Sequence, residues 1–149
     1  MKHRITVAAV AAATALSGAC AFGVSAASAS PSAPKNHTVS FTSVQEAMVN
    51  LGQHTASEQD KDVNKAGKVI GYDLLYFVFN PKTETARLNF TAVVNGGFIY
   101  GVANAGANPT IHGTVTGGTG TFKGAAGTIL AKNLNQAGTK TAITITYHT

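Results

Sequence analysis

The most informative stretch of the sequence is Val115-Thr-Gly-Gly-Thr-Gly-Thr-Phe-Lys-Gly-Ala-Ala-Gly-Thr-Ile129. The glycines in its first half free the backbone to make a tight turn. Phe122 then adds a large aromatic side chain, and the small residues after it allow a second strand to pack closely against a neighbour. We therefore predict two strands joined by a glycine-rich turn, with structural roles for Gly117, Gly118, Gly120, Phe122, Ala125 and Gly127.

Short runs on both sides of this segment have the composition of β-strands. They are rich in Val, Ile, Thr, Phe and Tyr and are separated by Gly, Asn and Pro, whereas helical periodicity is almost absent. Between two of them, Asn95-Gly96-Gly97 is a strong signal for a two-residue hairpin. The runs predict strands at 39–51, 68–79, 85–94, 97–104, 109–116, 125–134 and 140–148, with a short eighth strand near 54–61.

The patterning of these runs indicates how the strands are covered. Residues 85–94 alternate between apolar and polar side chains, which predicts one core face and one solvated face. Residues 72–79 are apolar on both faces, which is typical of a strand covered inside by a barrel and outside by a partner subunit in a dimer or trimer. Because closure protects sheet edges most completely, we predict an all-β protein that forms a small antiparallel closed β-barrel of seven or eight strands. An open sandwich is the alternative.

Residues 117–127 read Gly-Gly-Thr-Gly-x-Phe-x-x-Ala-x-Gly, which resembles the signature of dirigent proteins and allene oxide cyclases and of their exported actinobacterial relatives. Residues 44–52 and 66–71 are similar to the first long strand and the next turn of that superfamily, so the resemblance covers about Val39 to His148. It implies a calycin-like barrel that confines an apolar ligand and steers its coupling or cyclisation. Asn50 stands where members commonly carry an acidic residue, so acid catalysis is not carried over to that corner.

The amino-terminal residues have the pattern of an export signal. Residues 1–4 carry two positive charges, residues 5–24 are uncharged and rich in Ala, and Ala27-x-Ala29 is a cleavage motif. A membrane anchor is the alternative, but the run is only weakly apolar. A lipid on Cys20 would need a motif that is displaced by one residue here. We predict a secreted protein with a Sec-type signal peptide over 1–29, a flexible leader over 30–38 and one barrel domain over 39–149, which keeps no cysteine for a disulfide.

Few side chains of the predicted domain carry evident chemistry. Two carboxylates are the catalytic candidates, Glu46 on the first long strand and Asp73 in the strand that is apolar on both faces. Candidates for ligand binding are Tyr76, Tyr100 and Asn104. The alternatives are partly exposed carboxylates near strand ends and tyrosines in the core or an interface. For an enzyme, the resemblance implies isomerase-like or cyclase-like chemistry without a metal or a cofactor.

Several other classes of function are disfavoured. The four histidines after the export signal are far apart in the sequence, so we predict no metal site. The sequence has no Gly-x-Ser-x-Gly elbow, no phosphate-binding loop and no basic cluster, which argues against a hydrolase, a nucleotide site and nucleic-acid binding. Two functions remain: a barrel that binds or guides an apolar small molecule, and a non-catalytic secreted barrel that self-associates or binds cell surfaces. A ligand-sized cavity favours the first, and a barrel filled by its own side chains favours the second.

Overall fold

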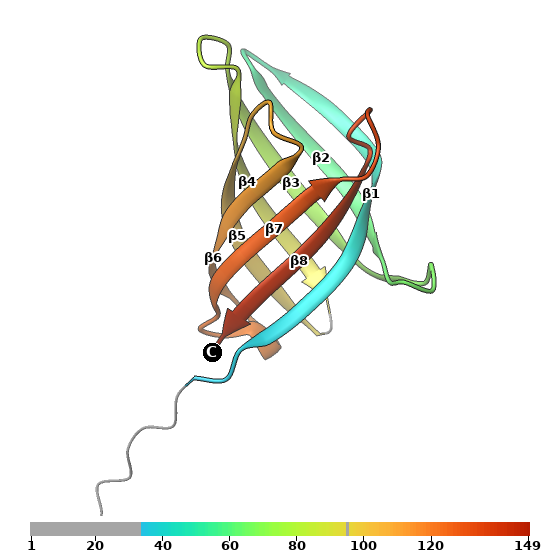
Figure 1. Cartoon of the computed structure of the whole chain (residues 1–149), viewed down its shortest axis with the longest axis vertical. Helices are drawn as coiled ribbons and strands as arrows, with labels where there is room; N and C mark the ends of the chain where they lie inside the picture. The colour runs from blue at the N-terminus through green and yellow to red at the C-terminus, as the bar shows by residue number, and fades with distance from the viewer. Residues whose placement is uncertain (1–33, 95) are drawn as a thin grey trace, which may run out of the picture. The chain divides into compact units, whose positions relative to one another are not determined.

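The computed structural model describes residues 34–94 and 96–149, which contain one closed barrel of eight antiparallel strands (Figure 1). Each strand pairs with the next along the chain, and the last strand pairs with the first. The predicted closed barrel is therefore confirmed, with all eight strands. They are β1 (His37–Gly52), β2 (Thr55–Val63), β3 (Val69–Asn80), β4 (Thr85–Val94), β5 (Gly97–Ala105), β6 (Thr110–Gly118), β7 (Ala126–Asn133) and β8 (Lys140–His148).

Two strands differ from the prediction. β1 begins at His37, inside the segment predicted as a leader, because His37 pairs with Tyr147 of β8 and the two rings stack with centroids 5.4 Å apart. β2 is a full strand of nine residues rather than a short one. Its buried positions are acidic, which hides the usual alternation of apolar and polar residues. The predicted signal peptide over 1–29 lies outside the described residues.

One end of the barrel is closed by its own side chains. The 3-10 helix η1 (Gly120–Phe122) lies at this end, near the C-terminus, and Phe122 is only 1% exposed (Figure 1). The Phe122 ring meets the Tyr147 ring edge-on, with centroids 5.2 Å apart. A Cβ atom at Gly118 would lie 2.5 Å from the Phe122 Cβ, so only glycine fits there. The buried core of this end comprises Phe41, Ala92, Val94, Ile99, Val115, Phe122, Ala125, Ile129, Ile145 and Tyr147.

The opposite end carries four hairpins and is open. Of these, β1–β2 and β3–β4 extend furthest from the closed end (Figure 1). The β4–β5 hairpin lies at the closed end, where Val94 pairs with Gly97 and Gly96 has a φ of +83°, a value that favours glycine. The barrel therefore has a closed floor and a mouth, and its mouth is framed by the ends of β1, β3, β5 and β7.

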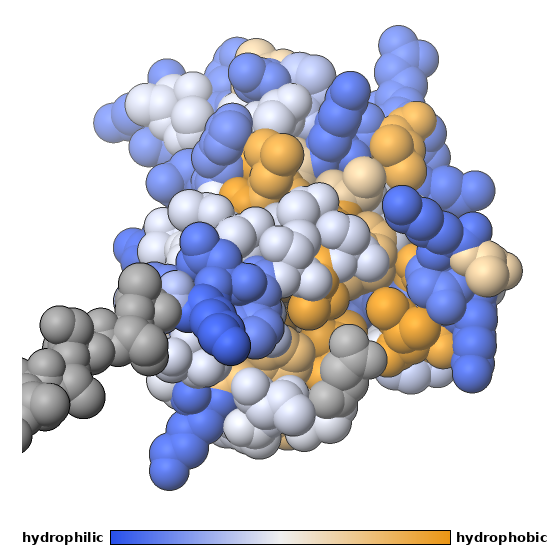
Figure 2. Space-filling view, turned by 60° about the horizontal axis from the view of Figure 1, so that its bottom comes forward, coloured by the Kyte–Doolittle hydropathy of each residue, from blue (hydrophilic) through white to orange (hydrophobic). Residues whose placement is uncertain are grey.

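Hydrophobic side chains also reach the outer surface of the barrel, and some are visible in the view of Figure 2. They are most concentrated on β3, where Leu75 and Phe77 face the interior and the alternate residues face outward. The outward residues are between 41% and 55% exposed, and they are Tyr72, Leu74, Tyr76 and Val78. Within the part of the chain that the structure describes, no helix is long and apolar enough to cross a membrane.

Candidate functional site

A cavity of about 250 Å³ lies in the open half of the barrel, next to the core of the closed end. Every strand contributes to its wall, because alternate residues of a strand point to the same side of the sheet. Most of the wall is apolar, and its largest side chains are Leu75, Phe77, Leu88, Phe90, Ile111 and Ile143. On the polar part of the wall, Thr141 Oγ1 donates a hydrogen bond to Asn133 Oδ1 at 3.2 Å. The cavity thus offers a mainly apolar environment with a few polar groups.

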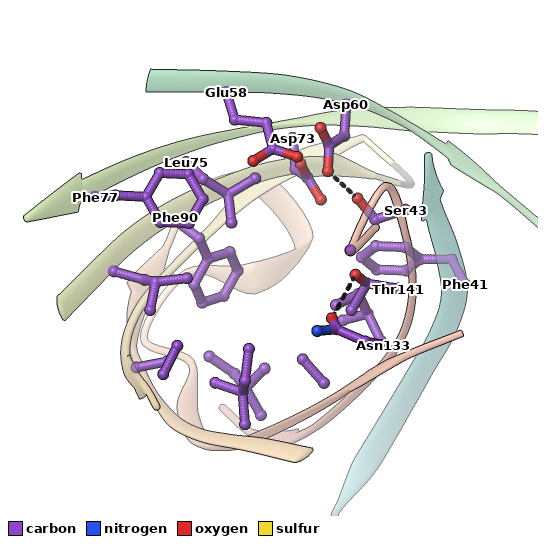
Figure 3. Close-up of a pocket in the computed structure, with 18 residues that line it drawn as sticks. Phe41, Ser43, Glu58, Asp60, Asp73, Leu75, Phe77, Phe90, Asn133 and Thr141 are labelled. Atoms are coloured by element: carbon purple, nitrogen blue, oxygen red, sulfur yellow. Dashed lines mark hydrogen bonds between the residues drawn. The ribbon is translucent and has the colours of Figure 1, made fainter. Parts of the chain in front are cut away.

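Carboxyl groups gather on one side of this cavity (Figure 3). Glu58, Asp60 and Asp62 are alternate residues of β2, so all three face the interior, and all are buried. Asp73 of β3 is the direct ladder partner of Asp60. Glu58, Asp60 and Asp73 line the cavity, whereas Asp62 is fully buried one step closer to the floor, opposite Ser43 of β1. We call these four residues the acidic cluster.

The acidic cluster is short of protein partners. Ser43 Oγ donates a short hydrogen bond to Asp60 Oδ2, as Figure 3 shows. In the described residues, no partner reaches Asp60 Oδ1, Asp73 Oδ1 or either carboxyl oxygen of Asp62. Within the part of the chain that the structure describes, no Lys, Arg or His side chain lines the cavity. Buried carboxylates without a counter-charge carry a large desolvation penalty, which favours the protonated forms of Glu58 and Asp62.

The shifts in pKa follow from this environment. Burial, and after it the charge of Asp60, raises the pKa of Glu58 to about 8. Burial, and after it the charge of Asp73, raises the pKa of Asp62 to about 8. For Asp73, burial and the charge of Asp60 raise the pKa to about 6, although the neighbouring Asp62 and Ser43 side chains lower it. The pKa of Glu58 is therefore raised further than that of Asp73, which makes Glu58 the better proton donor of the two and Asp73 the better proton acceptor.

The acidic cluster is not arranged as a metal centre. In residues 34–94 and 96–149, no group of three or more His, Cys, Asp or Glu side chains has the geometry to hold a metal ion. What the arrangement offers is a pair of roles, proton donor and proton acceptor, on the wall of an apolar cavity. Carboxyl groups whose environments separate their pKa values are typical of general acid and base chemistry.

The structure places the candidates from the sequence on opposite sides of the barrel wall. Asp73 lines the cavity. Glu46 lies at a bulge in β1 and forms an ion pair with Lys61, with 3.2 Å between Oε1 and Nζ, and it does not line the cavity. Tyr76 is 41% exposed on the outer face of β3. Tyr100 and Asn104 alternate with the inward residues of β5 and also do not line the cavity.

Sequence reasoning missed Ser43, Glu58 and Asp60. A signal was present in Glu58-Gln-Asp-Lys-Asp62, where three carboxylates recur at every second residue. At strand spacing, this places all three on one face. The sequence predicts only a short strand near 54–61, and closure of the barrel turns the acidic face of this segment inward.

No protein-family model and no curated protein sequence matches the chain. Solved structures match its fold. The pterocarpan synthase dirigent protein GePTS1 matches with a TM-score of 0.67 and 17% identity, over 77% of this chain and 89% of that chain. A pyocyanin demethylase matches with a TM-score of 0.62 and 15% identity, over 74% of this chain and 99% of that chain. AbnU, an exo-specific intermolecular Diels-Alderase, matches with a TM-score of 0.58 and 10% identity, over 77% of this chain and 99% of that chain. The chain therefore has the eight-stranded barrel fold of the dirigent proteins.

Proposed function

We propose that this protein binds an apolar small molecule in the open half of the barrel and controls the geometry of its cyclisation or coupling. The observation that carries the proposal is the acidic cluster on the wall of a mainly apolar cavity. An apolar pocket with a few convergent polar groups of perturbed pKa is the usual form of a small-molecule site. The other function considered from the sequence requires no cavity at all.

The chemistry would depend on confinement and on proton transfer. A ligand held against Leu75, Phe77 and Phe90 loses conformational freedom before it reacts, which lowers the entropic part of the barrier. Glu58 would donate a proton to an oxygen of the ligand that gains negative charge, and Asp73 would accept a proton released elsewhere on the ligand. The similar barrels include a synthase and a Diels-Alderase, so this fold is compatible with such chemistry.

A cavity-blocking variant tests ligand binding. Ala103 lines the cavity, whereas Ala142 lies between the lining residues Thr141 and Ile143 of β8 and faces outward. We expect Ala103→Trp to abolish binding of the neutral fluorescent probe N-phenyl-1-naphthylamine, and Ala142→Trp to retain it. Equal binding by both variants and the unmodified protein would place the ligand site elsewhere.

The catalytic part of the proposal needs the natural ligand. Native mass spectrometry of the exported protein identifies a molecule that copurifies with it, and chiral chromatography then follows its conversion. We expect Glu58→Gln to slow this conversion by roughly 100-fold or more, within the range for loss of a general acid. Glu46→Gln is the matched control, because Glu46 is a carboxylate of the neighbouring strand that faces Lys61 and not the cavity.

We also propose that the protein is exported and associates with copies of itself. Export rests on the charged start, the Ala-rich run and the Ala27-x-Ala29 motif. Self-association rests on the outer face of β3, where Leu74 is 55% exposed and lies between Tyr72 and Tyr76. Amino-terminal sequencing of the protein in the culture medium should begin near Ser30. Native mass spectrometry should give a dimer or trimer that Leu74→Glu dissociates, and a monomeric unmodified protein would contradict the proposal.

A further inference from the structure

The polarity of the barrel interior changes in steps from the floor to the mouth. The floor is apolar and closed around Phe122. The acidic cluster forms the next layer on β2 and β3. Towards the mouth, Asp73 is followed on the inner face of β3 by Leu75, Phe77 and Phe79, which are all apolar. A molecule that enters through the mouth therefore meets apolar wall first and carboxyl groups last.

The apolar wall continues past the cavity onto the extended β1–β2 hairpin. An open groove of about 470 Å³ lies there, and Phe77 lines both the groove and the cavity. Met48, Ala56 and Phe79 also line the groove, and the centroid of the His54 ring lies 6.4 Å from that of the Phe79 ring. We call Met48, Ala56, Phe77 and Phe79 the mouth shelf. Met48 and Phe79 are 58% and 42% exposed, so the mouth shelf is apolar surface open to solvent.

The deep end of this path carries negative charge that the protein does not balance. Asp60 and Asp73 are 6% and 5% exposed, line the cavity, and each has one oxygen without a protein partner. The nearest cation along β2 is Lys61, which faces outward to Glu46. Among the described residues, no group of three or more His, Cys, Asp or Glu side chains is arranged to hold a metal ion. An organic cation with an apolar body fits both the missing counter-charge and the apolar walls.

We propose that the ligand is an elongated amphiphile with a protonated amine, bound with the amine among Glu58, Asp60 and Asp73 and the apolar chain along Phe77 to the mouth shelf. This inference rests on the proposed ligand-binding function and names the class of ligand. An ammonium group has three donors, which matches the number of carboxyl groups that line the cavity. A neutral ligand would leave the charge of the Asp60 and Asp73 pair uncompensated.

The proposal predicts that amine binding depends on pH. On β1, Ser43 and Gln45 face the amine, and on β2 and β3 the four residues of the acidic cluster do so. The next strand, β4, presents Phe90 and Ala92, which do not titrate. Because the raised pKa values keep protons on Glu58 and Asp62 near neutral pH, the negative charge of the acidic cluster, and with it the attraction for an ammonium group, increases as the pH rises. A primary amine stays protonated up to a pH of about 10. Affinity for the amine should therefore rise from about pH 5 to about pH 9, and affinity for the matching alcohol should stay constant.

The test is displacement of N-phenyl-1-naphthylamine from the full chain by three molecules of equal length: decylamine, decanol and decanoate. We expect decylamine to bind about tenfold or more tightly than decanol at neutral pH, with decanoate weakest. The double variant Asp60→Asn with Asp73→Asn should lose this preference and still bind decanol, which shows that it is folded. Glu58→Gln should weaken the preference, and Glu46→Gln should retain it in full.

The mouth shelf has its own test. Phe79→Ser should weaken decylamine binding by about fivefold and leave butylamine binding unchanged, because the short chain ends inside the cavity. Leu130→Ser, on the outer face of β7 and away from the proposed self-association face, is the control and should change neither. The inference is overturned if decanol binds as tightly as decylamine, or if the preference for decylamine survives in the double variant. Either result leaves the proposed function standing. Failure of the unmodified protein to bind the fluorescent probe overturns both.

Discussion

Asp60 of β2 and Asp73 of β3 are direct partners across the antiparallel ladder, and both side chains face into the barrel. Opposed residues on one face of such a ladder have Cβ atoms roughly 5 Å apart, and like charges at that distance are destabilising. No basic residue of the cavity wall offsets the repulsion. Ser43 satisfies one oxygen of Asp60 and leaves the other free. An arrangement that weakens the fold and points into a cavity is better explained by binding or catalysis than by packing.

The first prediction is that the protein loses stability as the pH rises. The pKa values of Glu58 and Asp62 are about 8 in the folded protein, above their ordinary values, so between about pH 4 and about pH 8 the folded state binds more protons than the unfolded state. The stabilising effect of these protons is complete below the unfolded pKa and is lost as the pH rises through the folded pKa. The melting temperature, measured by calorimetry, should therefore fall from about pH 5 to about pH 9. A melting temperature that rises over this range would contradict the buried acidic cluster.

The second prediction assigns part of that loss to Asp62. This residue is fully buried and neither of its carboxyl oxygens has a protein partner, so ionisation above its raised pKa is costly. Asp62→Asn removes the ionisable group and keeps the shape of the side chain. We expect it to increase the free energy of unfolding by about 1–3 kcal/mol near pH 9, and to flatten the pH dependence. Denaturant titration measures the change.

A matched control uses the exposed carboxylate of the same hairpin. Glu46 forms a surface ion pair with Lys61, and such pairs contribute about 0–1 kcal/mol. Glu46→Gln should therefore change stability little and leave the pH dependence in place. Equal effects of Glu46→Gln and Asp62→Asn would show that the pH dependence does not originate in the barrel interior.

The strands could be predicted wherever packing imposes an alternation of apolar and polar residues. β4 is the clearest case, since Leu88 and Val94 are buried as its pattern requires. β2 was predicted as short because its interior positions hold Glu58, Asp60 and Asp62, which a pattern of apolar residues does not detect. Their burial follows from closure of the barrel, which pairs β2 on one side with β1 and on the other with β3.

The candidate site was harder to predict, because the sequence does not show which side chains of a strand face the barrel interior. β3 is apolar at both sets of alternate positions, so its sequence does not distinguish Leu75, which lines the cavity, from Tyr76, which is exposed outside. Asp73 was selected from the sequence as the single carboxylate in this apolar strand. Its partner Asp60 could be found only from the register between β2 and β3.

The third prediction concerns Phe122 at the floor. Its side chain is 1% exposed and packs edge-on against Tyr147, so Phe122→Ala leaves a cavity in the closed end. We expect the free energy of unfolding to fall by roughly 3–5 kcal/mol, the range for removal of a large buried side chain. Chemical denaturation measures the loss. Phe98→Ala is the control, because Phe98 is 43% exposed and should cost clearly less.

The last prediction separates structure from ligand binding in the glycine-rich segment. A Cβ atom at Gly118 would lie 2.5 Å from both the Phe122 Cβ and the Phe98 carbonyl oxygen, so Gly118→Ala forces the floor to shift. Overpacking of this kind costs roughly 1–3 kcal/mol. At Gly106 of the mouth the nearest atom, Thr85 Cγ2, is 3.7 Å away, so Gly106→Ala should cost much less. Denaturation and probe binding should be measured on both variants. Gly118→Ala should lower stability and retain probe affinity, since the floor lies below the cavity. Unchanged stability with lost binding would place the glycine-rich segment in the ligand site and would contradict its structural role.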